Sequence, residues 1–259
     1  MTGLVVVSRH GRVAHVQLAD GERNNALGPQ LVSDLREAIR DATDLGSAVV
    51  LSAQGKHFCA GGDHSEAAAL TADEFRGYLV DLVSLFDEVT RCPVPVVVCV
   101  QRGAIGGGVE LALCGDLVVA GTDAYFSLPQ IPLGIRVGEY TYRSLVARVG
   151  LSLARRMVLL GERVPAATAW SAGLADRLAE PVDLVDAGLE LASTLAGCRP
   201  SALERARSAF NDVVGSADLL RAEVARRSGS SPAGSSSALG RPDGSTQPRD
   251  WSVWSDRRQ

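Results

Sequence analysis

The sequence predicts an α/β fold in which strands alternate with helices through the first half of the chain and a mostly helical region follows. Short apolar runs that begin near residues 48 and 96 are separated by amphipathic stretches, as in repeated ββα or βαβ units. From about residue 138 to residue 227 the apolar residues recur at helical spacing. Residues 228–259 hold nine Ser, four Gly and three Pro, so we expect a disordered tail there.

The first elements are a hairpin and a helix. Two β-rich runs, Leu4–Ser8 and Val13–Leu18, flank Gly11, which predicts two antiparallel strands. Pro29 then suits the first turn of a helix. The apolar residues that follow it at helical spacing are Leu31, Val32, Leu35, Ala38 and Ile39. The chain therefore begins with a ββα unit.

The alternation continues to about residue 137. The predicted elements are, in order, a strand at Ala48–Leu51, a loop at Lys56–His64, a helix whose apolar face runs from Tyr78 to Val89, a strand at Val96–Val100, a loop at Gly103–Gly108 that opens a short helix through Leu113, and a strand at Asp116–Ala120. We accordingly divide the chain into a core at 1–137, a helical region at 138–227 and the tail at 228–259.

Composition excludes several classes of protein. Hydrophobic residues make up 46% of the 259 residues and charged residues 22%, as in globular proteins. The net charge of −4 argues against nucleic-acid binding, which requires clustered basic residues. The N-terminus lacks a signal-peptide pattern, and no apolar run reaches the ~18 residues of a membrane span. The five cysteines lack CxxC or CxxxC spacing, so we expect reduced thiols, no metal site and a cytoplasmic location.

Two glycine-rich loops carry the candidate chemistry. They are Gly55–His64, with the sequence GKHFCAGGDH, and Gly103–Leu111, with the sequence GAIGGGVEL. Each follows a predicted strand and precedes a predicted helix, where glycines expose backbone N–H groups that can bind a developing oxyanion. Glu110 lies three residues after Gly107, about one helical turn, and can present a carboxylate on the same side as that amide.

Other motifs of catalysis have little support. The second loop has the pattern G-x-x-G-G-G in place of the dinucleotide-binding G-x-G-x-x-G, and no acidic residue ends the next strand. The sequence contains no G-x-S-x-G, no H-E-x-x-H and no G-x-x-x-x-G-K-[ST]. Serine hydrolases, zincins and P-loop enzymes are therefore not indicated.

Together the motifs HFCAGGD, GAIGGGVELALCGD, YFSLPQIPLGI and AWSAGLADRL resemble the crotonase, or enoyl-CoA hydratase/isomerase, superfamily over about residues 5–215. The resemblance implies a spiral of repeated ββα units and a helical C-terminal region that assembles a homotrimer or a dimer of trimers. It also implies an acyl-thioester substrate whose carbonyl oxygen is held by the amides of Gly62 and Gly107. Glu110 falls on the first of the two glutamates that hydratases use.

The second glutamate position holds Gln130. A glutamine can hold a water molecule but cannot exchange a proton, and one acid/base group contributes ~10²–10⁴ in rate. Glu139 lies near the position where other family members place an aspartate, and its alternative role is that of an acid in the first turn of a helix. Glu110, Gly62, Gly107, Gln130 and Glu139 are the catalytic candidates.

The residues that the resemblance places around the thioester carrier are Arg23, Ala26, Lys56, Ala60, Gly61 and Asp63. Asp63 could equally cap the turn after the loop. His64 and Ser65 replace the apolar and basic residues of many relatives, and the serine-rich tail replaces the family's last helix. The carrier is therefore coenzyme A or the phosphopantetheine of an acyl carrier protein, in either case as part of the substrate. No separate cofactor is expected.

Three side chains near the loops have competing explanations. Cys59 suits packing better than nucleophilic attack, because no base lies near it in the sequence. His57 is expected to be exposed. His64 is either a surface histidine or a site residue, as in family decarboxylases.

The function that these observations favour is enoyl-CoA hydration or dehydration, the reaction of a lyase in fatty acid metabolism. Double-bond isomerisation and decarboxylation remain open, since either can proceed with one proton-transferring group. A non-catalytic accessory subunit of a polyketide or other secondary-metabolite pathway is the alternative of a different class.

Overall fold

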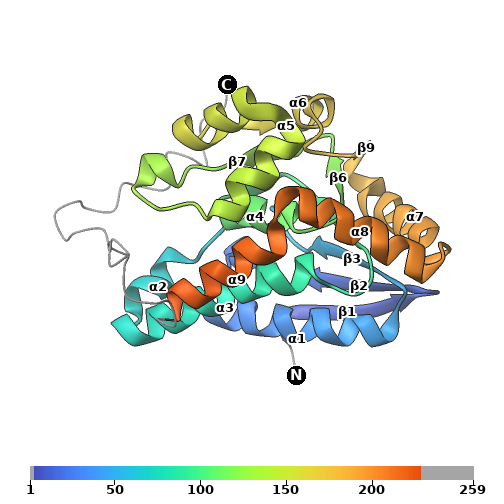
Figure 1. The fold of residues 1–259 in the computed structure, drawn as a ribbon, viewed down its shortest axis with the longest axis horizontal. Coiled ribbons are helices and arrows are strands. Elements are labelled where there is room, and N and C mark those ends of the chain that lie inside the picture. The colour runs from blue at the N-terminus through green and yellow to red at the C-terminus, as the bar shows by residue number, and fades with distance from the viewer. Residues whose placement is uncertain (1–2, 229–259) are drawn as a thin grey trace.

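The structure, a computed structural model, describes residues 3–228 (Figure 1). The tail predicted to be disordered lies outside the described residues, apart from Ser228.

A six-stranded sheet forms the centre of the fold, in the order β1-β2-β3-β4-β6-β9. The first pair is antiparallel and the later neighbours are parallel. The strands are β1 (Val5–His10), β2 (Val13–Leu18), β3 (Ala48–Ala53), β4 (Val96–Val100), β6 (Leu117–Gly121) and β9 (Arg177–Ala179). The predicted hairpin and the strand at Val96–Val100 are confirmed.

The two central strands, β3 and β4, are apolar at every position except Ser52, because both faces of the sheet are covered. In β4, Val96, Val98 and Val100 face one hydrophobic core, while Val97 and Cys99 face the other. Helices α1 (Pro29–Leu45) and α3 (Ala72–Thr90) pack on the first face. Helix α7 (Leu184–Ala196) packs on the second face, as Figure 1 shows. Side chains that alternate along each strand thus separate into two cores.

A second sheet of three strands completes the repeat. It contains β5 (Gly103–Ile105), β7 (Tyr125–Ser127) and β8 (Val164–Pro165) in that order. The chain passes from β4 in the large sheet to β5 in the small sheet and then into helix α4 (Gly107–Leu113). This is the predicted ββα unit. β5 lies in the segment predicted to be a loop, because three residues that include a glycine show no periodicity.

The helical region contains strands as well as helices. The helices after residue 138 are α5 (Glu139–Leu160), α6 (Ala166–Ala172), α7, α8 (Pro200–Val214) and α9 (Ser216–Arg227). Between them β8 joins the small sheet and β9 the large one, so the division at residues 137 and 138 does not separate sheet from helix. Neither strand was predicted, since strands of two and three residues are too short to show alternation.

The remaining short elements are helix α2 (His64–Ala69) and three 3₁₀ turns, η1 (Gly21–Arg23), η2 (Ile131–Leu133) and η3 (Pro181–Asp183). After α8, Gly215 adopts φ +67°, and α9 then continues along α3 (Figure 1). Leu220 of α9 is buried in the core that α1 and α3 share. The C-terminal part of the described chain therefore covers the same side of the sheet as α3.

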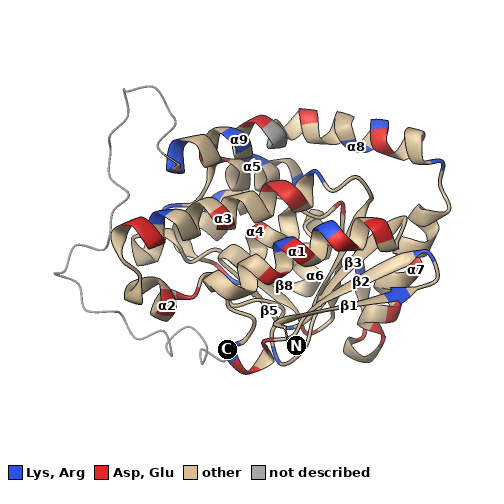
Figure 2. Cartoon of the chain, turned by 90° about the horizontal axis from the view of Figure 1, so that it is seen from below, with Lys and Arg blue, Asp and Glu red and all other residues tan. Residues whose placement is uncertain are grey.

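Acidic and basic residues are interspersed along α1, α8 and α9 (Figure 2). No helix within residues 3–228 is both long enough and apolar enough to cross a lipid bilayer.

Candidate active site

The two glycine-rich loops lie against each other. Cys59 N–H donates to the carbonyl of Gly103 (3.2 Å), and Ile105 N–H donates to the carbonyl of Cys59 (3.0 Å). On its other side the first loop pairs with Leu27, whose N–H donates to the carbonyl of Gly61 (2.7 Å). These main-chain hydrogen bonds hold the backbone of the two loops together.

Sterics explain the glycines at this contact. Gly61 adopts φ +90°, and a Cβ there would lie 2.6 Å from the carbonyl oxygen of Ile105. A Cβ on Gly108 would lie 2.4 Å from the carbonyl oxygen of Cys59. Real Cβ contacts are never this short, so the loops can approach each other only with glycine at both positions.

The approach brings the amides of Gly62 and Gly107 together. A Cβ on Gly107 would lie 3.6 Å from the nitrogen of Gly62. Gly107 begins α4, where the N–H groups of the first turn have no partner within the helix. Within residues 3–228, no backbone carbonyl accepts a hydrogen bond from either amide. Two adjacent unpaired N–H groups are what an oxyanion requires.

Tyr78 of α3 lies next to Gly62 and binds the segment beside it. Its hydroxyl donates to the carbonyl of Leu27, and a Cβ on Gly62 would lie 3.5 Å from the same hydroxyl. Burial raises the pKa of this phenol, so it remains a neutral donor. The sequence placed Tyr78 on an apolar helix face, which gave no indication of this contact.

Glu110 lies one turn into α4. Its carboxylate is half-buried and accepts a hydrogen bond from the hydroxyl of Thr141 in α5 (2.8 Å). Burial raises the pKa of Glu110 above its usual value, against the opposing effects of the Thr141 hydroxyl, the charge of Arg227 and the backbone of Gly138. A carboxyl group whose pKa is raised towards neutrality is suited to accept a proton and to return it.

Gln130 lies beside the start of the same helix. A Cβ on Gly106 would lie 3.5 Å from Nε2 of Gln130, and the Glu110 N–H donates to the carbonyl of Gly106 (3.1 Å). Gln130 is buried, and its Oε1 accepts no hydrogen bond from the described part of the chain. A buried carboxamide oxygen of this kind is available to a water molecule or a ligand.

Comparison with known proteins identifies the family. The family model for enoyl-CoA hydratase/isomerase matches residues 8–229. The chain belongs to the enoyl-CoA hydratase/isomerase family. It is an enzyme of the crotonase type, acting on acyl thioesters.

Individual relatives cover most of the chain. A probable enoyl-CoA hydratase of Mycobacterium tuberculosis is 34% identical over 243 residues, which are 86% of this chain and 96% of the relative. The 2,3-dehydroadipyl-CoA hydratase of Escherichia coli is 38% identical over 215 residues, covering 80% of this chain and 81% of the relative. A solved enoyl-CoA isomerase of M. tuberculosis superposes with a TM-score of 0.80 at 25% identity, covering 88% of this chain and 99% of the other.

Glu139, in contrast to Glu110, pairs with a side chain of its own helix. It is the first residue of α5, is mostly exposed and pairs with Arg143 four residues later (3.0 Å). This is the alternative that the sequence left open, an acid in the first turn of a helix. The residue of α5 that contacts Glu110 is Thr141, and nothing in the sequence pattern distinguished it.

Arg23, a candidate for phosphate contact, is bound by carboxylates of its own chain. Its guanidinium pairs with Asp63 and Glu66 and lies 3.8 Å from Asp20. Asp63 caps α2, as the sequence allowed, and accepts from the N–H of Glu66 and the hydroxyl of Ser65. Burial would raise the pKa of Asp63, but these hydrogen bonds and Arg23 hold it at about 2. The charge of Arg23 is largely neutralised within this cluster.

The other carrier candidates surround the same loop. Lys56 is exposed, Ala26 and Ala60 are half-buried, and Gly61 is buried. The Ala60 N–H donates to the carbonyl of Asn24 (3.0 Å), which ties the loop to the segment that holds Ala26. Lys56 is therefore the more accessible of the two proposed cations.

The histidine and the thiol near the loops stabilise the fold. His57 Nδ1 accepts the N–H of Gly103 (3.2 Å), and burial lowers the pKa of this imidazole. His57 is therefore half-buried and not exposed as predicted. Cys59 is fully buried, which raises its pKa to about 12, so it is not a nucleophile at neutral pH. His64 is exposed at the first position of α2.

Proposed function

We propose that this enzyme adds water across the α,β-double bond of an enoyl thioester. The observation that carries the proposal is the position of Glu110, a carboxylate of raised pKa one helical turn from the adjacent amides of Gly62 and Gly107. Relatives that are named hydratases, among them the two described above, support the same reaction.

The steps follow from these groups. The thioester carbonyl oxygen accepts hydrogen bonds from the two amides, which withdraws electron density from Cβ. Ionised Glu110 takes a proton from a water molecule that the Gln130 carboxamide holds, and the hydroxide bonds to Cβ. The π electrons of the double bond move onto the carbonyl oxygen as an enolate, which the two N–H groups stabilise by about 2.7–4 kcal/mol per donor. Protonated Glu110 then gives its proton to Cα, and the thioester is restored.

Isomerisation is the second candidate, and Gln130 is the observation that favours it. With an amide at this position, one carboxylate must make every proton transfer. Moving a double bond needs only one group, which removes a proton at one carbon and returns it at another. The structural neighbour named an enoyl-CoA isomerase is consistent with this reaction.

The proposal extends to the carrier and the assembly. Coenzyme A, or the phosphopantetheine of a carrier protein, enters as part of the substrate, with Lys56 near its phosphates. We also propose a homotrimer or a dimer of trimers, since apolar side chains are exposed on α5, α6 and α8, namely Leu151, Leu159, Leu160, Trp170, Phe210 and Val213. Four buried free thiols support a reducing compartment such as the cytoplasm.

The substitution Gln130→Glu tests the reaction. A second carboxylate beside the water position should raise the hydration of crotonyl-CoA by ~10²–10⁴, the contribution of one acid/base group. Gln130→Ala is the matched control, because it removes the amide and supplies no proton. Hydration and the conversion of a 3-enoyl to a 2-enoyl thioester are followed in parallel by mass spectrometry.

The outcomes distinguish the proposed reactions. If the wild-type protein hydrates crotonyl-CoA and Gln130→Glu does so faster, the protein is a hydratase. If the wild-type protein isomerises the 3-enoyl thioester but does not hydrate crotonyl-CoA, and Gln130→Glu leaves the isomerisation rate unchanged or lowers it, the protein is an isomerase. A folded wild-type protein that converts neither thioester contradicts both and favours decarboxylation, tested with a malonyl-type thioester, or an accessory role.

A further inference from the structure

Leu27 contacts both glycine-rich loops of the catalytic site. It is fully buried and forms a parallel bridge with Gly62, in which its N–H donates to the carbonyl of Gly61 (2.7 Å) and its carbonyl accepts the N–H of Asp63 (3.4 Å). Its side chain packs on the second loop, where a Cβ on Gly107 would lie 3.1 Å from Cδ1 of Leu27. Both of the amides that form the proposed oxyanion site therefore belong to residues that lie against Leu27.

The bridge fixes the direction of the Gly62 amide. In a parallel pair, the hydrogen bonds of one residue go to the two neighbours of its partner, and the N–H and carbonyl of the partner itself point the other way. The bonds of Leu27 go to Gly61 and Asp63, so the N–H of Gly62 is directed away from Leu27 and stays available to a ligand. The direction of this N–H therefore depends on how closely Leu27 holds the backbone on either side of Gly62.

Tyr78 of α3 binds the carbonyl of Leu27 that takes part in this bridge. Its side chain is buried, and its hydroxyl donates to that oxygen at 2.5 Å. The N–H of Asp63 approaches the same oxygen only to 3.4 Å, which is longer than the roughly 2.7–3.2 Å of an ordinary N–H···O bond. The phenol is therefore the main donor to Leu27, and the bridge is loose on the side of Asp63.

Without the phenol, the buried carbonyl of Leu27 would keep one long hydrogen bond. An incompletely paired carbonyl in the core costs free energy, so the N–H of Asp63 would be drawn in to an ordinary distance of about 2.9 Å. That movement would pull the backbone of Gly62 toward Leu27 and turn its N–H away from the direction that it shares with Gly107. Resting on the proposed function for the role of the two amides, we propose that Tyr78 is a positioning residue, which acts through Leu27 to aim the Gly62 N–H at the thioester oxygen.

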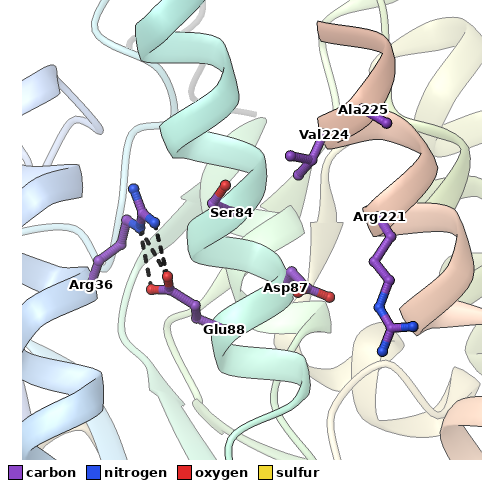
Figure 3. Close-up of a pocket in the computed structure, with 7 residues that line it drawn as sticks. All are labelled: Arg36, Ser84, Asp87, Glu88, Arg221, Val224 and Ala225. Carbon is purple, nitrogen blue, oxygen red and sulfur yellow. Dashed lines mark hydrogen bonds and ion pairs between the residues drawn. The ribbon is translucent and has the colours of Figure 1, made fainter. Parts of the chain in front are cut away.

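Helix α3 supplies both the test variants and a matched control. Tyr78→Phe removes the hydroxyl and keeps the ring, and Tyr78→Met is a second variant without a donor, whose flexible side chain adapts to gaps in a core. The control Ser84→Ala removes a hydroxyl from the same helix. Ser84 lines a shallow pocket of about 310 Å³ between α1, α3 and α9, whose wall also contains Asp87 and Arg221 (Figure 3). Neither the glycine-rich loops nor Leu27 line this pocket.

The first measurement does not depend on turnover. Butyryl-CoA, a saturated thioester with an isotopic label in its carbonyl group, is bound to each protein, and isotope-edited infrared spectra give the frequency of the carbonyl stretch. Because hydrogen bonds to the oxygen weaken the C=O bond, the wild-type protein should lower this frequency relative to the free thioester. Tyr78→Phe and Tyr78→Met should return the band part of the way to its free position, whereas Ser84→Ala should keep the wild-type band.

The second measurement is the kinetics of crotonyl-CoA hydration. Loss of a whole oxyanion donor costs ~10²–10³ in kcat, so a misdirected donor in Tyr78→Phe should cost about tenfold, with KM nearly unchanged. Ser84→Ala should keep the wild-type kcat. Circular dichroism checks that each variant is folded, and a purely structural role of Tyr78 would lower the melting temperature without displacing the carbonyl band.

A wild-type carbonyl band in the folded Tyr78 variants would overturn the inference. A rise in KM at unchanged kcat would overturn it as well, because it would indicate direct contact between Tyr78 and the substrate. The two measurements also keep the inference apart from the proposed function. The expected displacement of the band, in a protein that does not hydrate crotonyl-CoA, rejects the reaction alone, whereas hydration with the same band in wild type and Tyr78→Phe rejects the positioning role alone.

Discussion

The two sides of the catalytic site are held in different ways. The Gly62 and Gly107 amides belong to backbone that is fixed by main-chain hydrogen bonds and by close contacts that admit only glycine. Glu110 is positioned by side chains, with Thr141 of α5 at 2.8 Å and Arg227 of α9 in electrostatic range. A backbone amide serves any acyl thioester equally, whereas a carboxylate can be altered by one substitution in a neighbouring helix. Under the proposed function, the first side would determine the class of substrate and the second would determine the reaction.

The largest expected effect is a loss of turnover on removal of the carboxylate from the Glu110 side of the site. Glu110→Gln keeps the volume of the side chain and removes its exchangeable proton, so turnover should fall by ~10²–10⁴. Kinetics with crotonyl-CoA measure the loss, and circular dichroism checks that the fold is intact. Turnover equal to that of the wild-type protein would exclude Glu110 as the acid/base.

The side of the site formed by backbone amides is tested at Gly107. Pro is compatible with the first position of α4 and removes the N–H, so kcat should fall by ~10²–10³ relative to Gly107→Ala. The Ala variant is the control because it keeps the N–H and adds the same Cβ, which would meet Cδ1 of Leu27 at 3.1 Å. If Pro and Ala behave alike, the amide of Gly107 does not bind the oxyanion.

The smallest expected effect concerns the support of Glu110. Thr141→Val removes a hydrogen bond to the carboxylate and should cost about tenfold in turnover at neutral pH. That hydrogen bond lowers the pKa of Glu110, so its loss should raise this pKa further. Because the base must be ionised, the acidic limb of the pH–rate profile should move to higher pH.

Thr141→Ser is the control, since it keeps a hydroxyl group and should keep the wild-type profile. A Thr141→Val profile that is lower at all pH values but not displaced would indicate a structural role for Thr141. Glu110 would then be the one tested residue on the side-chain side of the site.

Much of the glycine-loop side could be predicted from the sequence. Glycines of the required spacing, placed between a strand and a helix, are a local feature, and the partner loop has the same pattern. Glu110 follows from helical spacing, and Gln130 follows from the resemblance of the LPQIPLG segment to the family. The sequence could not show whether Arg23 is free to bind a phosphate, because its ion pairs with Asp63 and Glu66 join residues up to 43 positions apart.

The sequence by itself determined the α/β repeat, the two loops and the single carboxylate at the start of α4, because each depends on residues adjacent in the chain or one helical turn apart. Only the tertiary structure decided which side chains surround that carboxylate. Thr141 reaches it from α5, and Arg227 approaches because α9 follows α8 after a bend at Gly215 and packs along α3. Such contacts arise when separate helices bury their apolar faces against one core, and no local pattern in the sequence records which polar residues then meet at the edge of that core.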